Sequence, residues 1–231
     1  MRAEEEYGVL GRREQWIRIE VWMIVAYMGC LYVVPGIFNL FRFGPSGFQS
    51  PQASDTPGHL GLLLRFRGGM WLSGDHPSMF GFVWPRLKEV LTWTLILVVI
   101  VFLERLYFLN RLDWFGFQPA EQAGVLLTLV TLFGLALMSA TYEEILIRGL
   151  LQTRLNELYG PGLAVGGSSA VFAVAHISYG VNGVFFALIT GLVLGIGRSR
   201  GGSLLTLSVA PAAWNTCIYF FWRSVVPAPP L

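Results

Sequence analysis

Long apolar runs, with charges confined to short clusters between them, constrain the fold of this chain more than any other feature. The run Leu126–Ala140, for example, carries no charged residue. Hydrophobic residues make up 54% of the 231 residues and charged residues 13%, a balance that excludes an ordinary soluble domain. About 20 consecutive apolar residues cross a bilayer as a helix. The pattern therefore predicts an all-α fold, a polytopic transmembrane helix bundle.

We expect about six spans in this bundle. The third would start at Pro119-Ala120-Glu121 and is too long for one upright span, so it should bend after its glutamates or project from the membrane. Gly160-Pro161-Gly162 should end it, and Pro35-Gly36 should kink the first. The expected helices are residues 21–41, 90–109, 120–158, 163–179, 181–197 and 203–222.

The same reading divides the chain into four parts. They are a polar N-terminal segment (1–20), two transmembrane helices with a long extramembrane loop at 42–84 (21–119), a four-helix core (120–224) and a tail (225–231). The loop contains a mostly apolar insert, Leu60–Phe66, and is equally consistent with a functional lid and with an ordinary surface loop. Its histidines, His59 and His76, match no metal motif and are expected to be exposed. Cys30 and Cys217 each lie in an apolar run and are expected to be buried.

Three ionisable residues interrupt the apolar core. In the segment Thr141–Leu150, Glu144 and Arg148 are four residues apart, the spacing and order that favour an ion pair on a helix. Glu143 has Ile147 as its own i+4 neighbour, so it lacks a cation on its face of the helix. A charge near a bilayer centre costs at least ~2.5–3.5 kcal/mol on insertion scales, so such residues are usually functional. We expect a paired carboxylate that shapes a site and an unpaired one that acts as a base.

Two further polar residues lie in later apolar helices. His176 ends the segment Ser169–His176, and Phe172 lies one turn before it, where it can pack against the imidazole. Asn215 could hydrogen-bond a neighbouring helix, or its amide could donate to a developing oxyanion. A carboxylate base, an imidazole and an amide donor together suffice to activate water and stabilise a tetrahedral intermediate. The reaction class indicated is amide hydrolysis without a covalent intermediate.

Other intramembrane protease chemistries lack their residues. No HExxH motif is present, and the only aspartates, Asp55, Asp75 and Asp113, are in predicted loops. Gly166–Ser169 is only a partial match to the serine-type GxSG motif. Neither cysteine has metal-ligand spacing, so we predict no metal and no cofactor. No basic stripe indicates a nucleic-acid partner.

The motifs Glu143-Glu144-xxx-Arg148 and Phe172-xxx-His176 resemble those of the CAAX protease and bacteriocin-processing enzyme (Abi) family, which are glutamic-type intramembrane proteases. The resemblance covers about residues 122–222. It implies that Glu143 and His176 activate water and that Glu144 and Arg148 shape the site. The family's third motif, HxxxN, implies that Asn215 stabilises the oxyanion. Pro211 stands at the position of its histidine, so the oxyanion hole must rest on Asn215, on another group or on a different substrate geometry.

This resemblance implies a CAAX prenyl endopeptidase-like hydrolase that acts on a membrane-anchored protein or peptide. Its role would be the processing or sorting of C-terminally anchored proteins. Its partners would then be that substrate and the lipid bilayer, and we expect a multi-pass protein of a prokaryotic cell (inner) membrane. Two alternatives remain. A non-catalytic immunity or scaffold protein on the same fold is supported by Pro211, and a small proton-coupled transporter has no interrupted repeats in its favour.

Overall fold

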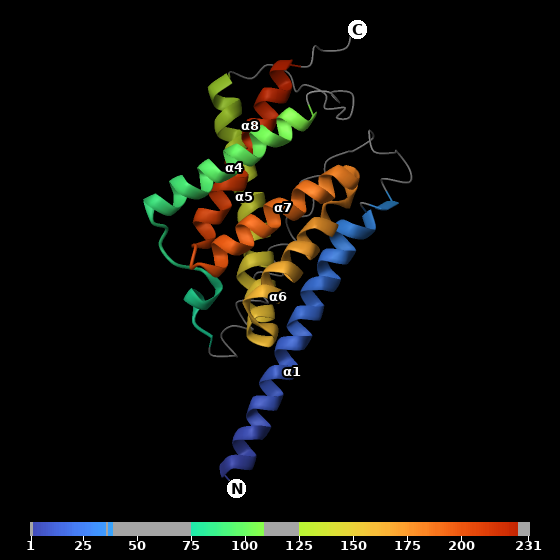
Figure 1. Ribbon diagram of the computed structural model, residues 1–231, viewed down its shortest axis with the longest axis vertical. Helices are drawn as coiled ribbons and strands as arrows, with labels where there is room; N and C mark the ends of the chain where they lie inside the picture. Colours follow the sequence, from blue (N-terminus) through green and yellow to red (C-terminus); the bar gives the residue numbers. More distant parts are fainter. Residues whose placement is uncertain (1, 36, 39–74, 109–124, 226–231) are drawn as a thin grey trace.

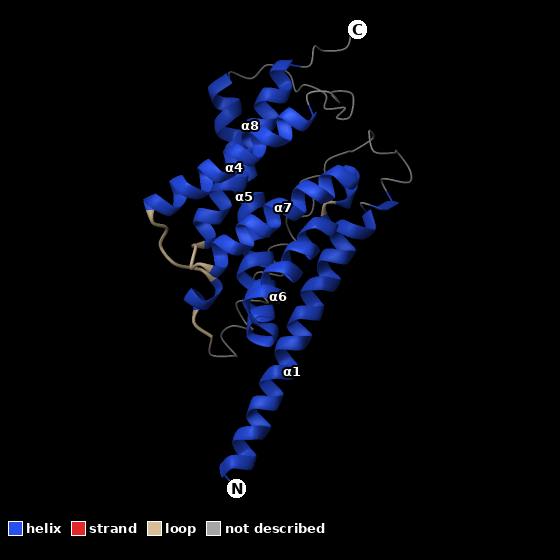
Figure 2. Ribbon diagram, viewed as in Figure 1, coloured by secondary structure: helices blue, strands red, loops and turns tan. Residues whose placement is uncertain are grey.

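The computed structural model describes residues 2–35, 37–38, 75–108 and 125–225 (Figure 1). Within these ranges all regular structure is helical and no strand occurs (Figure 2), which confirms the predicted fold class. The elements are α1 (Arg2–Met28), the π-helical η1 (Gly29–Val33), the 3-10 turn η3 (Pro77–Phe80), α4 (Leu87–Phe108), α5 (Val125–Glu144), the π-helical η5 (Ile145–Leu151), α6 (Gln152–Ala175), the 3-10 turn η6 (Ile177–Tyr179), α7 (Gly180–Ser199) and α8 (Leu204–Val225).

Helices distant in sequence pack side by side (Figure 1). Helix α5 packs on α8, which also packs on α4, while α6 packs on α7 and on the long α1. The core where they meet is apolar and is formed largely by η5, whose Leu146, Ile147, Leu150 and Leu151 are buried together with Phe172 of α6. The segment that follows the two glutamates of the predicted site therefore lies at the centre of the bundle.

Two helical stretches in the described part of the chain are long and apolar enough to cross a membrane, Phe133–Ala175 and Ile177–Ser199. Only 33% of the residues in the most apolar window of each are buried, so most of their apolar side chains lie at the molecular surface. A lipid environment accepts such a surface, whereas water does not. The expected total of about six spans stays a prediction.

The first of these stretches is divided at Gly160. This residue has φ 80° and ψ 172°, a combination essentially restricted to glycine, and Pro161 follows it. The helix that begins in α5 and continues through η5 thus ends where the sequence predicted, and the rest of α6 starts after Pro161. The predicted helices at 181–197 and 203–222 correspond to α7 and α8. The expected start at Pro119-Ala120-Glu121 lies outside the described residues.

The N-terminal region differs from the expected span at 21–41. Helix α1 already begins at Arg2, because the polar segment 1–20 contains good helix formers and an i,i+4 ion pair in which Arg18 contacts Glu14 at 2.7 Å. The helix then widens into η1. Of the predicted Pro35-Gly36 kink, Gly36 lies outside the described residues. So do His59 and the insert Leu60–Phe66 of the predicted loop.

Two single-residue expectations have opposite outcomes. His76 is exposed, as predicted, and its Nδ1 accepts the backbone N–H of Ser78 at 3.3 Å to cap η3. Cys30 was expected to be buried, and this is wrong, because its side chain is exposed on η1 as a free thiol. An apolar helix in a membrane can turn such a residue toward lipid, so an apolar run does not imply burial within the protein. The side chain of Cys217 is outside the described part.

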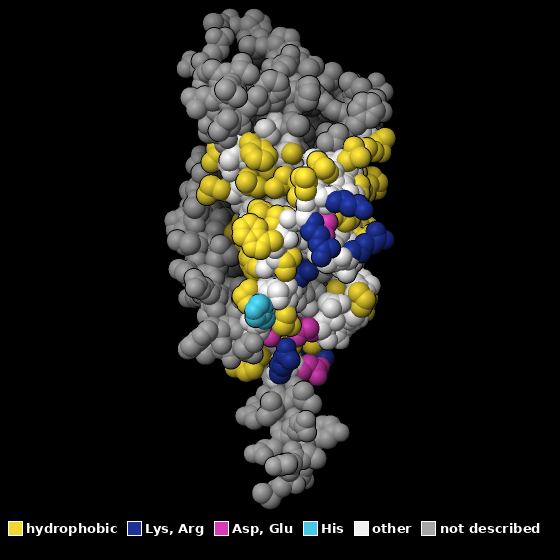
Figure 3. Space-filling view, turned by 90° about the vertical axis from the view of Figure 1, so that its left-hand side faces the viewer, with side chains coloured by type: hydrophobic (Ala, Val, Ile, Leu, Met, Phe, Trp, Pro, Cys, Tyr) yellow, Lys and Arg dark blue, Asp and Glu magenta, His cyan; other side chains and the backbone are white. Residues whose placement is uncertain are grey.

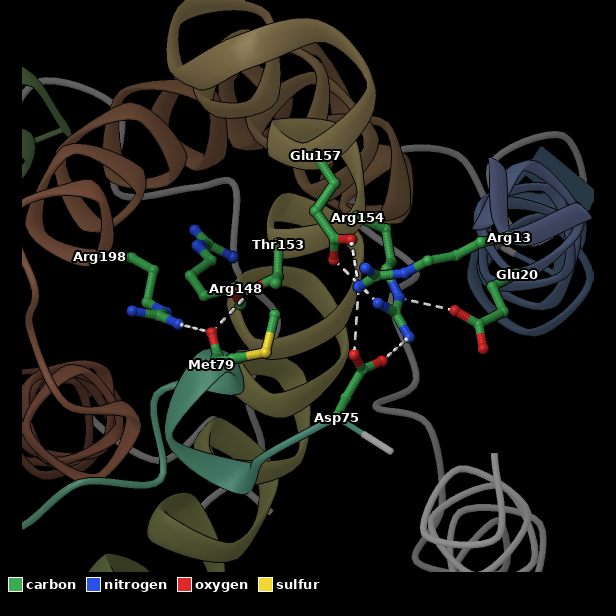
Figure 4. Close-up of polar contacts among 9 residues, drawn as sticks. All are labelled: Arg13, Glu20, Asp75, Met79, Arg148, Thr153, Arg154, Glu157 and Arg198. Carbon is green, nitrogen blue, oxygen red and sulfur yellow. Dashed lines mark hydrogen bonds and ion pairs between the residues drawn. The ribbon is translucent and has the colours of Figure 1, made fainter. Parts of the chain in front are cut away.

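A network of ion pairs, the Arg154 network, joins α1, α6 and the segment that leads into η3 (Figure 4). The Arg154 guanidinium is only 2% exposed and lies 2.6 Å from Glu20, 2.8 Å from Asp75 and 2.8 Å from Glu157. Arg13 adds a more exposed contact to the last two carboxylates. On the face shown in Figure 3, charged side chains gather below a band of hydrophobic ones.

Candidate active site

The candidate site begins where α5 passes into η5. Glu144 Oε1 and Arg148 Nη1 are 3.5 Å apart, and both side chains are almost completely buried. The ion pair predicted from their i,i+4 spacing is therefore present. It forms although the backbone of Ile145–Leu151 is π-helical, a form that occurs mostly as short segments and frequently at functional sites. The widened turn begins immediately after the two adjacent glutamates.

Arg148 connects this segment to α6 and α7. Its Nη2 donates to the carbonyl oxygen of Gly191 at 3.4 Å, and its guanidinium lies 4.5 Å from the ring centroid of Phe172. Helix α7 comes this close because Gly191 has no side chain, since a Cβ there would lie 3.1 Å from Cβ of Ser169. A buried cation held by a carboxylate, a carbonyl and an aromatic face has a fixed position.

His176 does not lie within a helix as the sequence suggested. Helix α6 ends at Ala175, and His176 is its C-cap residue with φ −92° and ψ 15°. The backbone N–H of His176 bonds to Ala173, one residue short of an α-helical step, so the carbonyl of Phe172 needs another donor. The imidazole supplies it, with Nδ1 2.8 Å from that oxygen. The physical reason for the difference is thus a side-chain cap at a helix end.

The same hydrogen bond selects the tautomer of His176. A carbonyl oxygen can only accept, so Nδ1 carries the proton and Nε2 of the neutral ring is left with a lone pair. The Phe172 ring packs against the imidazole with centroids 4.5 Å apart, as expected from their spacing. Phe172 therefore contacts both Arg148 and His176, and a continuous chain of contacts runs from Glu144 through Arg148 and Phe172 to His176.

Glu143 differs from Glu144 in both exposure and contacts. It is half-buried, and its Oε1 accepts a weak hydrogen bond of 3.5 Å from Ser139, one turn earlier on α5. Within the described residues it forms no ion pair, in keeping with the absence of a cation on its helix face. Glu143 is therefore the more accessible of the two carboxylates.

Some buried polar atoms of the pair are left without a hydrogen bond. Glu144 Oε2, Arg148 Nε and Arg148 Nη1 have no hydrogen-bond partner among the described residues, although Nη1 faces Glu144 in the ion pair. Buried polar atoms in this state are uncommon and costly. The described residues contain no group of three or more His, Cys, Asp or Glu side chains that could hold a metal ion.

Asn215 and Pro211 lie on α8, outside this chain of contacts. The Asn215 side chain is exposed and makes no hydrogen bond to another described residue. Pro211 is half-buried inside the helix and offers no donor. The structure thus brings Glu144, Arg148, Phe172 and His176 together, with Glu143 adjacent on the chain, and leaves Asn215 unconnected to them.

Two residues of the site were missed by sequence reasoning. Gln152, one turn after Arg148, donates to the carbonyl of Gly195 at 2.8 Å and accepts from Ser168 at 3.5 Å. Tyr179 stacks on His176, with centroids 5.8 Å apart and ring planes 25° apart. Sequence spacing is the signal that could have found them, because Gln152 lies four residues after Arg148 and Tyr179 lies three residues after His176.

One comparison with known proteins matches the part of the chain that carries this site. Residues 124–217 match the family model described as type II CAAX prenyl endopeptidase, Rce1-like. No curated protein and no solved structure matches the chain. The matched range includes all of the residues in the contact chain, together with Glu143, Tyr179 and Asn215. Residues 124–217 therefore form a domain of the Rce1-like type II CAAX prenyl endopeptidase family.

Proposed function

We propose that this protein is a glutamic-type intramembrane endopeptidase, which hydrolyses a peptide bond in a membrane-anchored protein or peptide. The observation that carries the proposal is the contact chain that runs from the buried Glu144–Arg148 pair, inside an apolar helix of membrane length, to His176 at the end of that helix. Burying its charges in such a place costs free energy, and the pair contributes little net stability, because a buried ion pair often stabilises a protein no more than a pair of apolar side chains of similar volume. The family match adds independent support for a protease.

In the proposed mechanism Glu143 is the base. It removes a proton from water, and the hydroxide oxygen bonds to the carbonyl carbon of the substrate while the C=O π pair moves to oxygen. Nε2 of neutral His176 accepts a hydrogen bond from the same water and orients it. Asn215 donates to the new oxyanion. Collapse of the intermediate breaks the C–N bond, and the leaving nitrogen takes the proton from Glu143.

The remaining residues of the site position these groups. The Glu144–Arg148 pair fixes the start of η5, and Phe172 holds both Arg148 and the imidazole. No metal or cofactor takes part in this scheme. The cellular setting we propose is a multi-pass protein in a prokaryotic cell membrane, with substrates that carry a C-terminal membrane anchor. The core of four helices would extend over residues 120–224.

The test compares wild-type protein with Glu143→Gln in the same cells. New protein termini in the membrane fraction are identified by mass spectrometry, and a peptide spanning the cleaved bond is then assayed with purified protein in liposomes. We expect cleavage to require Glu143, while Glu143→Gln keeps the thermal stability of the wild type. Glu89→Gln, a surface glutamate on α4, is the matched control and should cleave normally. Absence of any Glu143-dependent cleavage would refute the proposal in favour of a scaffold or immunity protein.

A further inference from the structure

Tyr179 lies beside one of the proposed catalytic groups, His176, but has no part in the mechanism so far. It ends the turn η6, between the cap of α6 and the start of α7, and its backbone N–H donates to the carbonyl of His176 at 3.0 Å. Its half-buried ring is nearly parallel to the imidazole. His176 is thus packed between Phe172 and Tyr179.

Tyr179 also brings a hydrogen-bond donor to this part of the site. A phenolic hydroxyl at such a position can donate one hydrogen bond. Arg148, a buried donor of the same site, contacts Glu144, the carbonyl of Gly191 and the Phe172 ring. Pro211 on α8 offers no donor, and Asn215 is unconnected to the cluster.

The position of Tyr179 depends on a glycine one turn later. A Cβ added to Gly183 would lie 2.3 Å from Cβ of Tyr179, a distance that real side chains do not adopt. Gly180, with φ 73°, provides the turn into α7 immediately after the tyrosine. Two adjacent features of the backbone therefore hold this ring against His176.

Building on the proposed function, we infer that Tyr179 is a catalytic residue, whose hydroxyl donates a hydrogen bond to the substrate oxygen as the tetrahedral intermediate forms. The hydroxyl keeps its proton throughout. When water attacks, the C=O π pair moves to oxygen, and the O–H group stabilises the resulting negative charge. The hydrogen bond from Tyr179 weakens again when the C–N bond breaks. Oxyanion holes commonly combine donors, and Tyr179 would complement Asn215.

The decisive variant is Tyr179→Phe, which retains the stacked ring and removes only the hydroxyl. We expect kcat on the peptide identified above to fall about 100- to 1000-fold, with KM nearly unchanged, because the lost bond strengthens only in the transition state. A phosphinic analogue of the same peptide, which mimics the tetrahedral intermediate, should bind correspondingly more weakly, while the uncleaved peptide binds as before. Tyr159→Phe removes a tyrosine hydroxyl that contacts Arg18 on the surface and should leave turnover unchanged.

A purely supporting role for the ring predicts a different pattern. Tyr179→Phe would then be as active as wild type, Tyr179→Leu would be impaired, and the phosphinic peptide would keep its affinity for the Phe variant. That result would overturn the inference and leave the proposed function intact, provided that Glu143→Gln is inactive. If Glu143→Gln cleaves normally, the proposed function fails first, and the inference fails with it.

Discussion

Removing one charge from the Glu144–Arg148 pair should destabilise the protein more than removing both. The side chains of Arg148 and Glu144 are 0% and 2% exposed, so neither charge can be solvated when its partner is lost. Arg148→Met keeps most of the volume and leaves Glu144 unpaired in an apolar core. Breaking a buried pair in this way costs about 3–5 kcal/mol. For a chain of this size that is a fall in melting temperature of roughly 6–20 °C.

The double variant Glu144→Gln with Arg148→Met removes both charges and keeps the shape of the pair. Replacing a whole buried ion pair is often neutral, so we expect most of the lost stability to return. Activity should not return with it, because the guanidinium that holds Phe172 and Gly191 is still absent. The two readouts together separate the structural role of the pair from its role in the site.

Thermal unfolding in detergent, followed by the fluorescence of the eight tryptophans, measures these differences. Arg86→Met serves as the control, since Arg86 is 84% exposed at 3.8 Å from Glu89 and should contribute only a few tenths of a kcal/mol. A double variant no more stable than Arg148→Met would contradict the charge argument. An Arg148→Met protein with the same melting temperature as Arg86→Met would contradict the charge argument as well.

Three further predictions concern other parts of the fold. Gly160→Ala should lower the free energy of unfolding by about 1–3 kcal/mol, because a residue with a side chain rarely adopts a φ of 80°, even though the space around Gly160 is open. Gly162→Ala, in the same open turn, should be tolerated. Arg154→Ala should lower the melting temperature, since it leaves Glu20 without its cation and Asp75 and Glu157 with only the exposed Arg13, and an effect as small as that of an exposed arginine would contradict this. Asn215→Ala should reduce turnover at least about 100-fold with little change in KM, and near-normal turnover would exclude it from the oxyanion hole.

The parts of the site that sequence predicted depend on contacts within one helix. The Glu144–Arg148 pair and the Phe172–His176 contact both follow from four-residue spacing, which α-helical geometry fixes almost regardless of the rest of the fold. The break at Gly160 was likewise predictable, because glycine followed by proline is a local signal. Such features need no knowledge of which helices pack together.

The features that sequence missed depend on helix ends or on packing between helices. The cap formed by His176 requires that α6 stop at Ala175, and helix ends are poorly defined by hydrophobic pattern. The π-helical segment η5 keeps the same residues in helix and therefore leaves no signal in composition. The exposure of Cys30 depends on which side of η1 meets the rest of the bundle, and apolar runs do not specify this.

The contacts that η5 and the start of α6 make with α7 explain why charged and polar groups persist in this core. Arg148 and Gln152, one turn apart, donate to the carbonyls of Gly191 and Gly195, which are also one turn apart. A slip of one helix by one turn, about 5.4 Å, would pair Arg148 with the wrong carbonyl and leave a buried donor unsatisfied. An apolar interface between such small residues would accept that slip at little cost. Because the arginine that sets this register also contacts Phe172, and Phe172 contacts His176, the polar contacts fix the alignment of the site rather than simply adding stability.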